Sequence, residues 1–235
     1  VPLPEYRGRS GAGDYGDYVV ETGTMIGKLL DEIDARGIAE ETIVIVTSDN
    51  GADWKPEDDA RFAHRANASW RGEKADAWEA GHRIPFVVRW PGRVQPGSTS
   101  AETGSLTDIM ATLAGALGLS LPDDAAEDSF DLQTALDRSA TAPIRPNIVD
   151  HSLEGIFTIR EGDWKLILGL GSGGFTAPRT AKPAAGGPEG QLYDLANDPR
   201  EENNLYLKRP EIVARLRATL EKLQSEGRSR PRRKA

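Results

Sequence analysis

Cysteine is absent from the 235 residues of this chain. Its absence excludes a disulfide framework, a thiolate metal site and a cysteine nucleophile within these residues. Long hydrophobic runs are absent as well, because no apolar stretch approaches the ~20 residues that a membrane-spanning helix needs. The sequence therefore predicts no membrane span.

Basic charge is also in deficit. The chain has 29 lysines and arginines against 37 aspartates and glutamates, which gives a net charge of −8. A protein that binds nucleic acid through its phosphates presents a basic face, so this composition argues against general nucleic-acid binding. The first ten residues, VPLPEYRGRS, include neither an initiating methionine nor the charged-then-apolar layout of a secretory signal. We therefore expect a chain that has been processed or truncated.

The first half of the sequence has the pattern of an α/β protein. Apolar residues recur at steps of three and four over 15–33, as in an amphipathic helix. The β-branched run 42–47 is typical of a strand that is buried on both faces of a parallel sheet. A second strand over 86–90 and a helix over 105–117 follow. We expect residues 1–122 to form the C-terminal part of a mostly parallel sheet flanked by helices.

The second half of the sequence differs from the first in composition and in its predicted elements. Residues 123–146 are acidic and contain proline, which is typical of a domain boundary. We expect residues 147–227 to form a small antiparallel subdomain, in which 156–168 fold as a hairpin. A short strand over 191–194 and a packing helix over 210–224 complete this subdomain.

Two further stretches of the second half have little regular pattern. Residues 169–190 are rich in glycine and proline, and we expect a flexible loop there. Residues 228–235 carry five basic side chains, and we expect a solvated, disordered end.

Asp49 and Asn50 follow the first predicted strand and offer hard oxygen ligands at the edge of a sheet, where ligand sites gather in open α/β folds. Calcium takes about six to eight such oxygens, so two side chains do not complete a site. An Asx turn that caps the loop is the alternative interpretation of the same residues.

A locally positive loop runs from 61 to 83 in this acidic chain. It contains Lys74, which suits sulfate or phosphate oxygens, together with His64, His82 and Arg83. The composition fits an anion site and a solvated loop of local ion pairs equally well. His151, after the strand-like residues 147–150, fits a pocket donor or a core histidine.

The order and spacing of several motifs resemble the second half of type I, formylglycine-dependent sulfatases of the alkaline phosphatase superfamily. The resemblance covers nearly the whole chain and is closest to arylsulfatases and N-acetylgalactosamine-6-sulfatase-like enzymes. It is carried by Thr47-Ser48-Asp49-Asn50-Gly51, the segment from Arg71 to Pro85, Arg89-Trp90-Pro91-Gly92, the helix segment 16–21, Leu192-Tyr193-Asp194-Leu195 and Asp198-Pro199.

The resemblance implies roles for particular residues. Asp49 and Asn50 would ligate calcium, and Lys74 would contact the sulfate group of a sulfated carbohydrate or an aryl sulfate. His64, His82, Arg83 and His151 are candidate substrate-binding residues only. The same resemblance implies export to the periplasm or to the outside of the cell.

One departure from the family pattern concerns the nucleophile. The family uses a formylglycine made from Cys or Ser in a Cys/Ser-x-Pro-x-Arg motif in its first half, which the resemblance does not cover. The only such spacing in this chain, Ser-x-Pro-x-Arg at 229–233, lies at the C-terminal end, away from the family's position. The first-half aspartate ligands of the metal are missing as well. We therefore expect the N-terminal half of the protein to be missing from this chain, and the chain alone to be inactive.

Two other interpretations stay open at this point. A phosphodiesterase or phosphonate hydrolase of the same superfamily fits the Asp-Asn-Gly motif, although the segment from Lys74 to Pro85 favours sulfate. A non-catalytic carbohydrate-binding or regulatory module fits a chain that keeps the basic loop and lacks the nucleophile.

Overall fold

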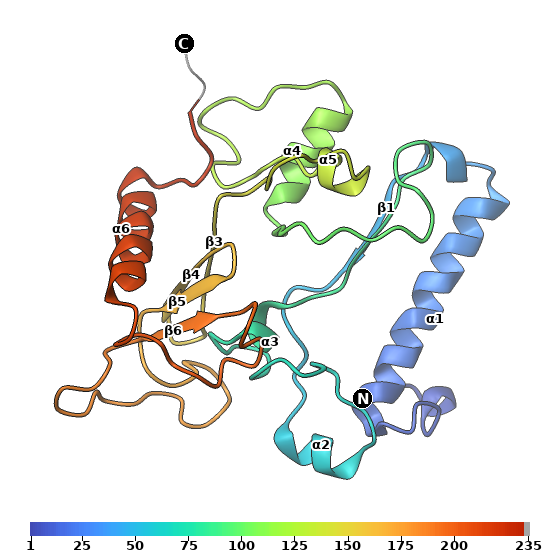
Figure 1. Ribbon diagram of the computed structural model, residues 1–235. Coiled ribbons are helices and arrows are strands. Elements are labelled where there is room, and N and C mark those ends of the chain that lie inside the picture. Colours follow the sequence, from blue (N-terminus) through green and yellow to red (C-terminus); the bar gives the residue numbers. More distant parts are fainter. Residues whose placement is uncertain (233–235) are drawn as a thin grey trace.

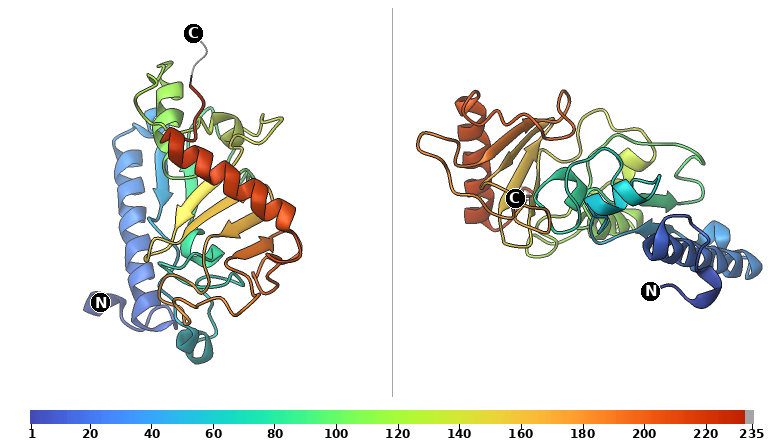
Figure 2. Two further views of the ribbon diagram at one scale, coloured as in Figure 1. Left: turned by 90° about the vertical axis from the view of Figure 1, so that its left-hand side faces the viewer. Right: turned by 90° about the horizontal axis from the view of Figure 1, so that it is seen from below.

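The computed structural model describes residues 1–232 and has two parts (Figure 1). The first part contains a two-stranded sheet, β1–β2, and the second contains a four-stranded sheet of order β3-β4-β5-β6. Figure 2 shows the long helices α1 and α6 at opposite ends of the molecule. The first part comprises the short 3-10 helices Pro4–Tyr6 and Ala39–Glu41 and the elements α1 (Gly13–Ala35), β1 (Val44–Thr47), α2 (Pro56–Arg61), α3 (Glu79–His82), β2 (Phe86–Arg89), α4 (Asp108–Ala116) and α5 (Gln133–Leu136).

The predicted α/β class is confirmed, but the two predicted strands of the first part pair antiparallel rather than parallel. Thr47, at the end of β1, lies opposite Phe86, at the start of β2. A parallel pair needs a connection that crosses back over the sheet, usually through a helix. Here the connecting loop returns at the same end of the sheet, and its helices α2 and α3 are too short to make that crossing.

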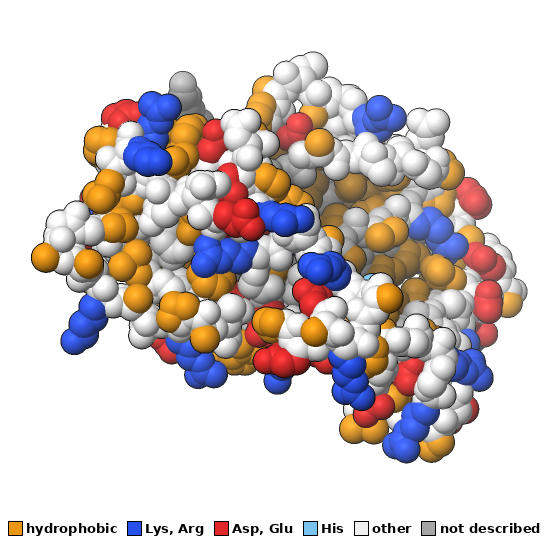
Figure 3. All heavy atoms as spheres, turned by 60° about the horizontal axis from the view of Figure 1, so that its bottom comes forward, with side chains coloured by type: hydrophobic (Ala, Val, Ile, Leu, Met, Phe, Trp, Pro, Cys, Tyr) orange, Lys and Arg blue, Asp and Glu red, His pale blue; other side chains and the backbone are white. Residues whose placement is uncertain are grey.

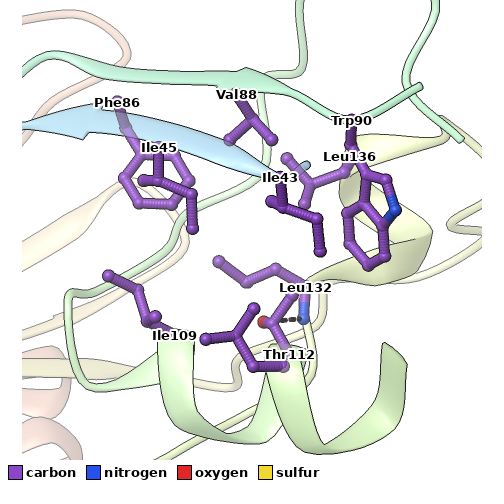
Figure 4. Close-up of a pocket in the computed structure, with 10 residues that line it drawn as sticks. Ile43, Ile45, Phe86, Val88, Trp90, Ile109, Thr112, Leu132 and Leu136 are labelled. Atoms are coloured by element: carbon purple, nitrogen blue, oxygen red, sulfur yellow. Dashed lines mark hydrogen bonds between the residues drawn. The ribbon is translucent and has the colours of Figure 1, made fainter. Parts of the chain in front are cut away.

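One face of the β1–β2 sheet packs on α4 and α5 (Figure 4). Apolar side chains of both strands meet apolar side chains of the helices, and Thr112 Oγ1 accepts a hydrogen bond from Leu132 N at 2.9 Å. At the start of α4 one half of a capping box is present, because the backbone N–H of Ser105 donates to Asp108 Oδ2 at 2.7 Å.

The predicted elements of the second part are confirmed. They are the strands β3 (Ile148–His151), β4 (Phe157–Glu161), β5 (Trp164–Ile167) and β6 (Gln191–Asp194) and the helix α6 (Pro210–Glu226). All neighbouring strands pair antiparallel, and β4 and β5 form the expected hairpin. Figure 2 shows α6 lying across one face of this sheet. The core between them contains Ile159, Leu166, Leu192, Val213, Leu216 and Leu220.

The expectation of a solvated C-terminal end is wrong for its first residues. Arg230 donates from its backbone to Glu127 O at 2.8 Å, and its guanidinium donates to the carbonyls of Pro122 and Ala125. Arg228 is 6% exposed and donates to Asp123 O at 2.7 Å. Arginine offers five donors, so it satisfies several loop carbonyls at once. Residues 233–235 of the predicted end lie outside the described residues.

Over residues 1–232, every helix is too short or too polar to cross a membrane.

Candidate functional site

The end of β1 is fitted tightly against α3 through Gly51. Its N–H donates to Gly81 O at 3.0 Å. A Cβ at this position would lie 1.6 Å from Ala80 O, so no residue but glycine fits without moving the backbone. Asn50 Nδ2 donates to Gly51 O at 2.9 Å, which leaves the Asn50 side-chain oxygen available as a ligand. The Asp49–Asn50 turn is thereby held at the wall of a cleft.

Lys74 is brought to the same place by backbone contacts. Its N–H donates to Ala52 O at 3.0 Å, two residues beyond Asn50. The side chain of Asn67 accepts from Ala52 N at 3.1 Å and donates to Ala52 O at 3.0 Å. The basic loop and the Asp-Asn turn are therefore joined as one unit.

The cleft beside this unit has a volume of about 1540 Å³, and Figure 3 shows a hollowed face with hydrophobic side chains in its floor. Most of the residues predicted for the site line it, namely Asp49, Asn50, Lys74, His82, Arg83 and His151. His64 does not. Its ring packs edge-on against Trp54 at a centroid distance of 5.4 Å, which leaves it in an aromatic cluster outside the cleft.

Asp76 ties the Lys74 loop to the glycine-rich segment. Its carboxylate is fully buried and accepts from the N–H groups of Glu73 at 3.0 Å, Phe175 at 2.8 Å and Thr176 at 3.1 Å. Residues 172–174 are buried against it, so the start of the predicted flexible loop is a packed part of the site. A Cβ on Gly174 would lie 2.3 Å from Ala75 O, which explains glycine there.

Trp78 fixes the Lys74 loop onto the second part of the molecule. It is 1% exposed, packs with Ile167 and Tyr193, and donates from Nε1 to Gln191 Oε1 at 3.0 Å. The Arg71 guanidinium stacks on the Trp78 ring at 3.7 Å. Burial of a tryptophan from a loop in the core of a neighbouring sheet makes the loop and the sheet fold together.

A buried ion cluster holds both ends of α3. Lys165 Nζ on β5 lies 3.0 Å from Glu79 Oε1 and 3.1 Å from Glu201 Oε1. Glu201 Oε2 also accepts from the N–H of Glu79 at 2.7 Å, at the start of the helix. Arg83, directly after the helix, donates from Nε to Glu79 Oε2 at 2.7 Å and stacks over Trp70 at 3.7 Å. Each buried charge therefore has an opposite partner, as burial requires.

This cluster sets the charge state of the groups near the cleft. Burial alone would raise the pKa of Glu79, but Lys165 and then Arg83 outweigh it and lower that pKa to about 2. Burial raises the pKa of Glu201, and Lys165 offsets part of that rise. Burial also lowers the pKa of His82, against the opposing effect of Asp150, whose Oδ1 lies 3.9 Å from His82 Nδ1.

His151 presents a defined face to the cleft. Its Nδ1 lies 2.8 Å from Ser152 O, and a carbonyl oxygen only accepts. Nδ1 therefore carries a proton, and in the neutral ring Nε2 is left as a hydrogen-bond acceptor for a hydroxyl group.

The oxygen donors of Asp49 and Asn50 suit calcium chemically, but they do not complete a site. Within residues 1–232, no group of three or more His, Asp or Glu side chains comes together to hold a cation. Two oxygens are about a third or fewer of the ligands that calcium takes. The remaining ligands of such a site would have to come from outside these residues.

Glu73, next to Lys74, is buried among other acids. It is 4% exposed, and burial together with Asp53 and Asp76 raises its pKa to about 7. Because the unfolded chain has a carboxyl of ordinary pKa, the folded chain loses stability as the pH rises from about 4.5 through 7. We expect Glu73→Gln to remove this loss, so that above pH 7 the variant is more stable than the parent by up to about 3 kcal/mol.

Urea unfolding at pH 4, 6 and 8 measures this effect. The two chains should have the same stability at pH 4, and the exposed Glu57→Gln is the matched control. A difference between Glu73→Gln and the parent that does not change with pH contradicts the prediction.

Sequence reasoning missed the supporting residues of the site: Gly51, Asn67, Asp76, Glu79, Lys165 and Glu201. Gly51, Asp76 and Glu79 stand in motifs that carry the resemblance, but their supporting roles were not predicted. The partners of Asp76 and Glu79 lie far away in the sequence, and no local pattern marks them.

Comparisons with known proteins agree on one family. Residues 4–119 match the family model described as Sulfatase. The chain is 37% identical to N-acetylgalactosamine-6-O-sulfatase of Bacteroides thetaiotaomicron, over 96% of this chain and 44% of that protein. It is 34% identical to human arylsulfatase A, over 84% of this chain and 40% of that protein.

The structural comparison agrees with the sequence comparison. A solved structure from work on glycosaminoglycan metabolism by Bacteroides thetaiotaomicron superposes with a TM-score of 0.80 at 34% identity, over 96% of this chain and 47% of that one. The chain thus spans less than half the length of these relatives. By sequence and by structure, it belongs to the sulfatase family.

Proposed function

We propose that this chain forms the sulfate-binding half of a sulfuric ester hydrolase. The observation that carries the proposal is that Lys74 lines the same cleft as Asp49 and Asn50, and that backbone hydrogen bonds through Ala52 hold these residues together. Membership in the sulfatase family supports sulfate over phosphate as the anion.

Each residue has a chemical task in this proposal. Cleavage of a sulfate ester builds negative charge on the sulfuryl oxygens and on the leaving oxygen. The Lys74 ammonium would bind those oxygens as a fixed positive charge. Asp49 and Asn50 would supply two oxygen ligands to a calcium ion, which when bound stabilises the same charge.

We infer that the nucleophile comes from outside the 235 residues, since they hold no cysteine and Ser229, in their single Ser-x-Pro-x-Arg segment at 229–233, does not line the cleft. We propose that a segment carrying the formylglycine, equivalent to the remaining half of the relatives, completes the site. The size of the cleft supports this proposal, because about 1540 Å³ exceeds the roughly 300–1,000 Å³ of an ordinary ligand pocket.

The outer face of α1 supports the same proposal. Tyr15, Tyr18, Met25 and Leu29 are 38%, 55%, 39% and 66% exposed and lie at helical spacing on one stripe. Val87 of β2 is 62% exposed beside an unpaired strand edge. Apolar stripes and open edges of this kind are usually covered by another part of a fold. We expect the chain produced alone to bind a hydrophobic dye and the bound fluorescence to fall when the N-terminal half is supplied.

The proposed substrate class is a sulfated carbohydrate. The bacterial relative with 37% identity is named for N-acetylgalactosamine 6-sulfate, and its similarity extends over 96% of this chain. The polar groups of His82, Asp150 and His151 on the cleft wall support a substrate with hydroxyl groups.

Binding of inorganic sulfate to the chain tests the anion site directly. We expect Lys74→Ala to lower the affinity at least tenfold, because a hydrogen bond to a charged group contributes about 1.5–3 kcal/mol. Calorimetric titration with sodium sulfate measures it, and the exposed Lys28→Ala on α1 is the matched control. Equal sulfate affinity of the parent and Lys74→Ala contradicts the assignment.

A further inference from the structure

Two exposed apolar side chains stand on the wall of the cleft that contains Lys74. Phe175 is 37% exposed and Leu153 is 63% exposed, and both line the cleft. Neither belongs to a helix or a strand, and the sulfate-binding role assigned to Lys74 makes no use of them. Large apolar groups left in contact with water at the wall of a polar site are typical of a ligand contact.

These side chains are held in place by backbone contacts. Phe175 N donates to the buried carboxylate of Asp76 at 2.8 Å, and Leu153 N donates to Ala75 O at 2.9 Å. Glu154 N donates to Gly173 O at 2.9 Å, which joins the two loops to each other. The loops that contain residues 75–76, 153–154 and 173–175 are thus joined by hydrogen bonds next to Lys74. The backbone positions of Leu153 and Phe175 are therefore fixed relative to the proposed anion site.

The backbone between them is strained. Ala75 has a φ of 77°, in the left-handed region that a residue with a Cβ seldom adopts. A non-glycine residue in this region costs free energy and persists where its surroundings hold it, commonly at binding sites. In this conformation the Ala75 carbonyl accepts the hydrogen bond from Leu153 N, which joins the two loops.

The surroundings indicate what kind of group would lie on these side chains. Asp150 and His151 line the same cleft, and His151 offers Nε2 as an acceptor. An aromatic ring beside hydrogen-bonding groups matches a pyranose, which has an apolar C–H face and hydroxyl groups at its edge. A steroid or a plain aryl group would leave those polar groups unused.

We propose that Phe175 and Leu153 form a platform that binds the pyranose ring carrying the sulfate ester. The proposal rests on the proposed function, since Lys74 would bind the sulfate group of the same molecule. Phe175 is in this view a specificity-determining residue, which distinguishes a sugar sulfate from sulfate alone.

The experiment uses the whole chain and two separate probes. Saturation-transfer NMR with unsulfated N-acetylgalactosamine reports contact with the sugar ring, and calorimetry with sodium sulfate reports the anion site. We expect Phe175→Ala to lower sugar binding about five- to tenfold and to leave sulfate affinity unchanged. Phe175→Tyr should keep sugar binding, and Leu207→Ala, an exposed apolar residue that does not line the cleft, should change neither.

The sugar measurement tests the platform, and the sulfate measurement tests the proposed function, so the two hypotheses can fail separately. Sugar binding that is unaffected by Phe175→Ala overturns the platform, even if sulfate binding depends on Lys74. Sugar binding that depends on Phe175 supports the platform, even if sulfate fails to bind and the anion site is wrong.

Discussion

Incubated alone with an aryl sulfate, the 235-residue chain is expected to release no product above background. The residues that line the cleft include lysines, histidines, arginines and carboxylates, but neither a cysteine nor a Ser-x-Pro-x-Arg segment to yield a formylglycine. Without a nucleophile no sulfate ester is cleaved, whatever charge the ammonium group proposed for Lys74 would stabilise. Hydrolysis of 4-nitrophenyl sulfate, followed by absorbance, measures the effect.

Addition of a partner is the positive control for this expectation. An N-terminal sulfatase half that carries a modified Cys-x-Pro-x-Arg motif should restore hydrolysis, and Lys74→Ala in this chain should abolish the restored activity. Lys28→Ala, on the exposed surface of α1, should leave it unchanged. Turnover by the purified chain alone that disappears in Lys74→Ala would show that a nucleophile exists within these residues.

The second large effect is expected at Gly51. In Gly51→Ala the new methyl group would meet Ala80 O at 1.6 Å, and the neighbouring contact is a backbone carbonyl that no side-chain rotation can relieve. The end of β1 and α3 must then separate, and the hydrogen bond from Gly51 N to Gly81 O is lost. We expect a loss of about 3 kcal/mol or more of unfolding free energy, or a fall in Tm of roughly 6–12 °C.

Thermal and urea unfolding measure the effect, with Gly23→Ala as the matched control. Gly23 lies inside α1, and a methyl group added there would have no atom within 4 Å apart from its chain neighbours and the backbone of its own helix, so alanine should stabilise the chain by up to about 1 kcal/mol. A Gly51→Ala chain that unfolds at the parental temperature would show that the turn does not pack against α3. Sulfate titration of the variant, kept below its Tm, should also show weakened binding, because Lys74 is tied to the same turn through Ala52.

Local patterns in the sequence were enough to predict several elements. The hairpin of β4 and β5, the strand β6 and the helices α1 and α6 follow from side-chain periodicity and turn residues within a few positions of each other. The chemistry-bearing residues could also be named in advance, because Asp49, Asn50 and Lys74 stand in motifs that resemble those of sulfatases. The cleft contains all three.

The arrangement of these pieces depends on contacts between distant residues. The antiparallel pairing of β1 with β2 depends on where a long loop returns, and no residue of either strand encodes that direction. His64 lies outside the cleft because its ring packs against Trp54. Arg228 is buried because it donates to a loop carbonyl that lies more than 100 positions earlier in the sequence.

The contacts that hold the site residues in place are also long-range contacts. Glu79 is bound by Lys165 and by Glu201, and Asp76 binds the backbone of Phe175, which lies 99 positions away. A buried charge is stable only beside an opposite charge or a set of donors, and the sequence does not say which distant residue will supply it. The motifs that resemble those of sulfatases name the groups proposed to bind an anion, whereas the fixed positions of these groups come from long-range burial that only the folded chain provides.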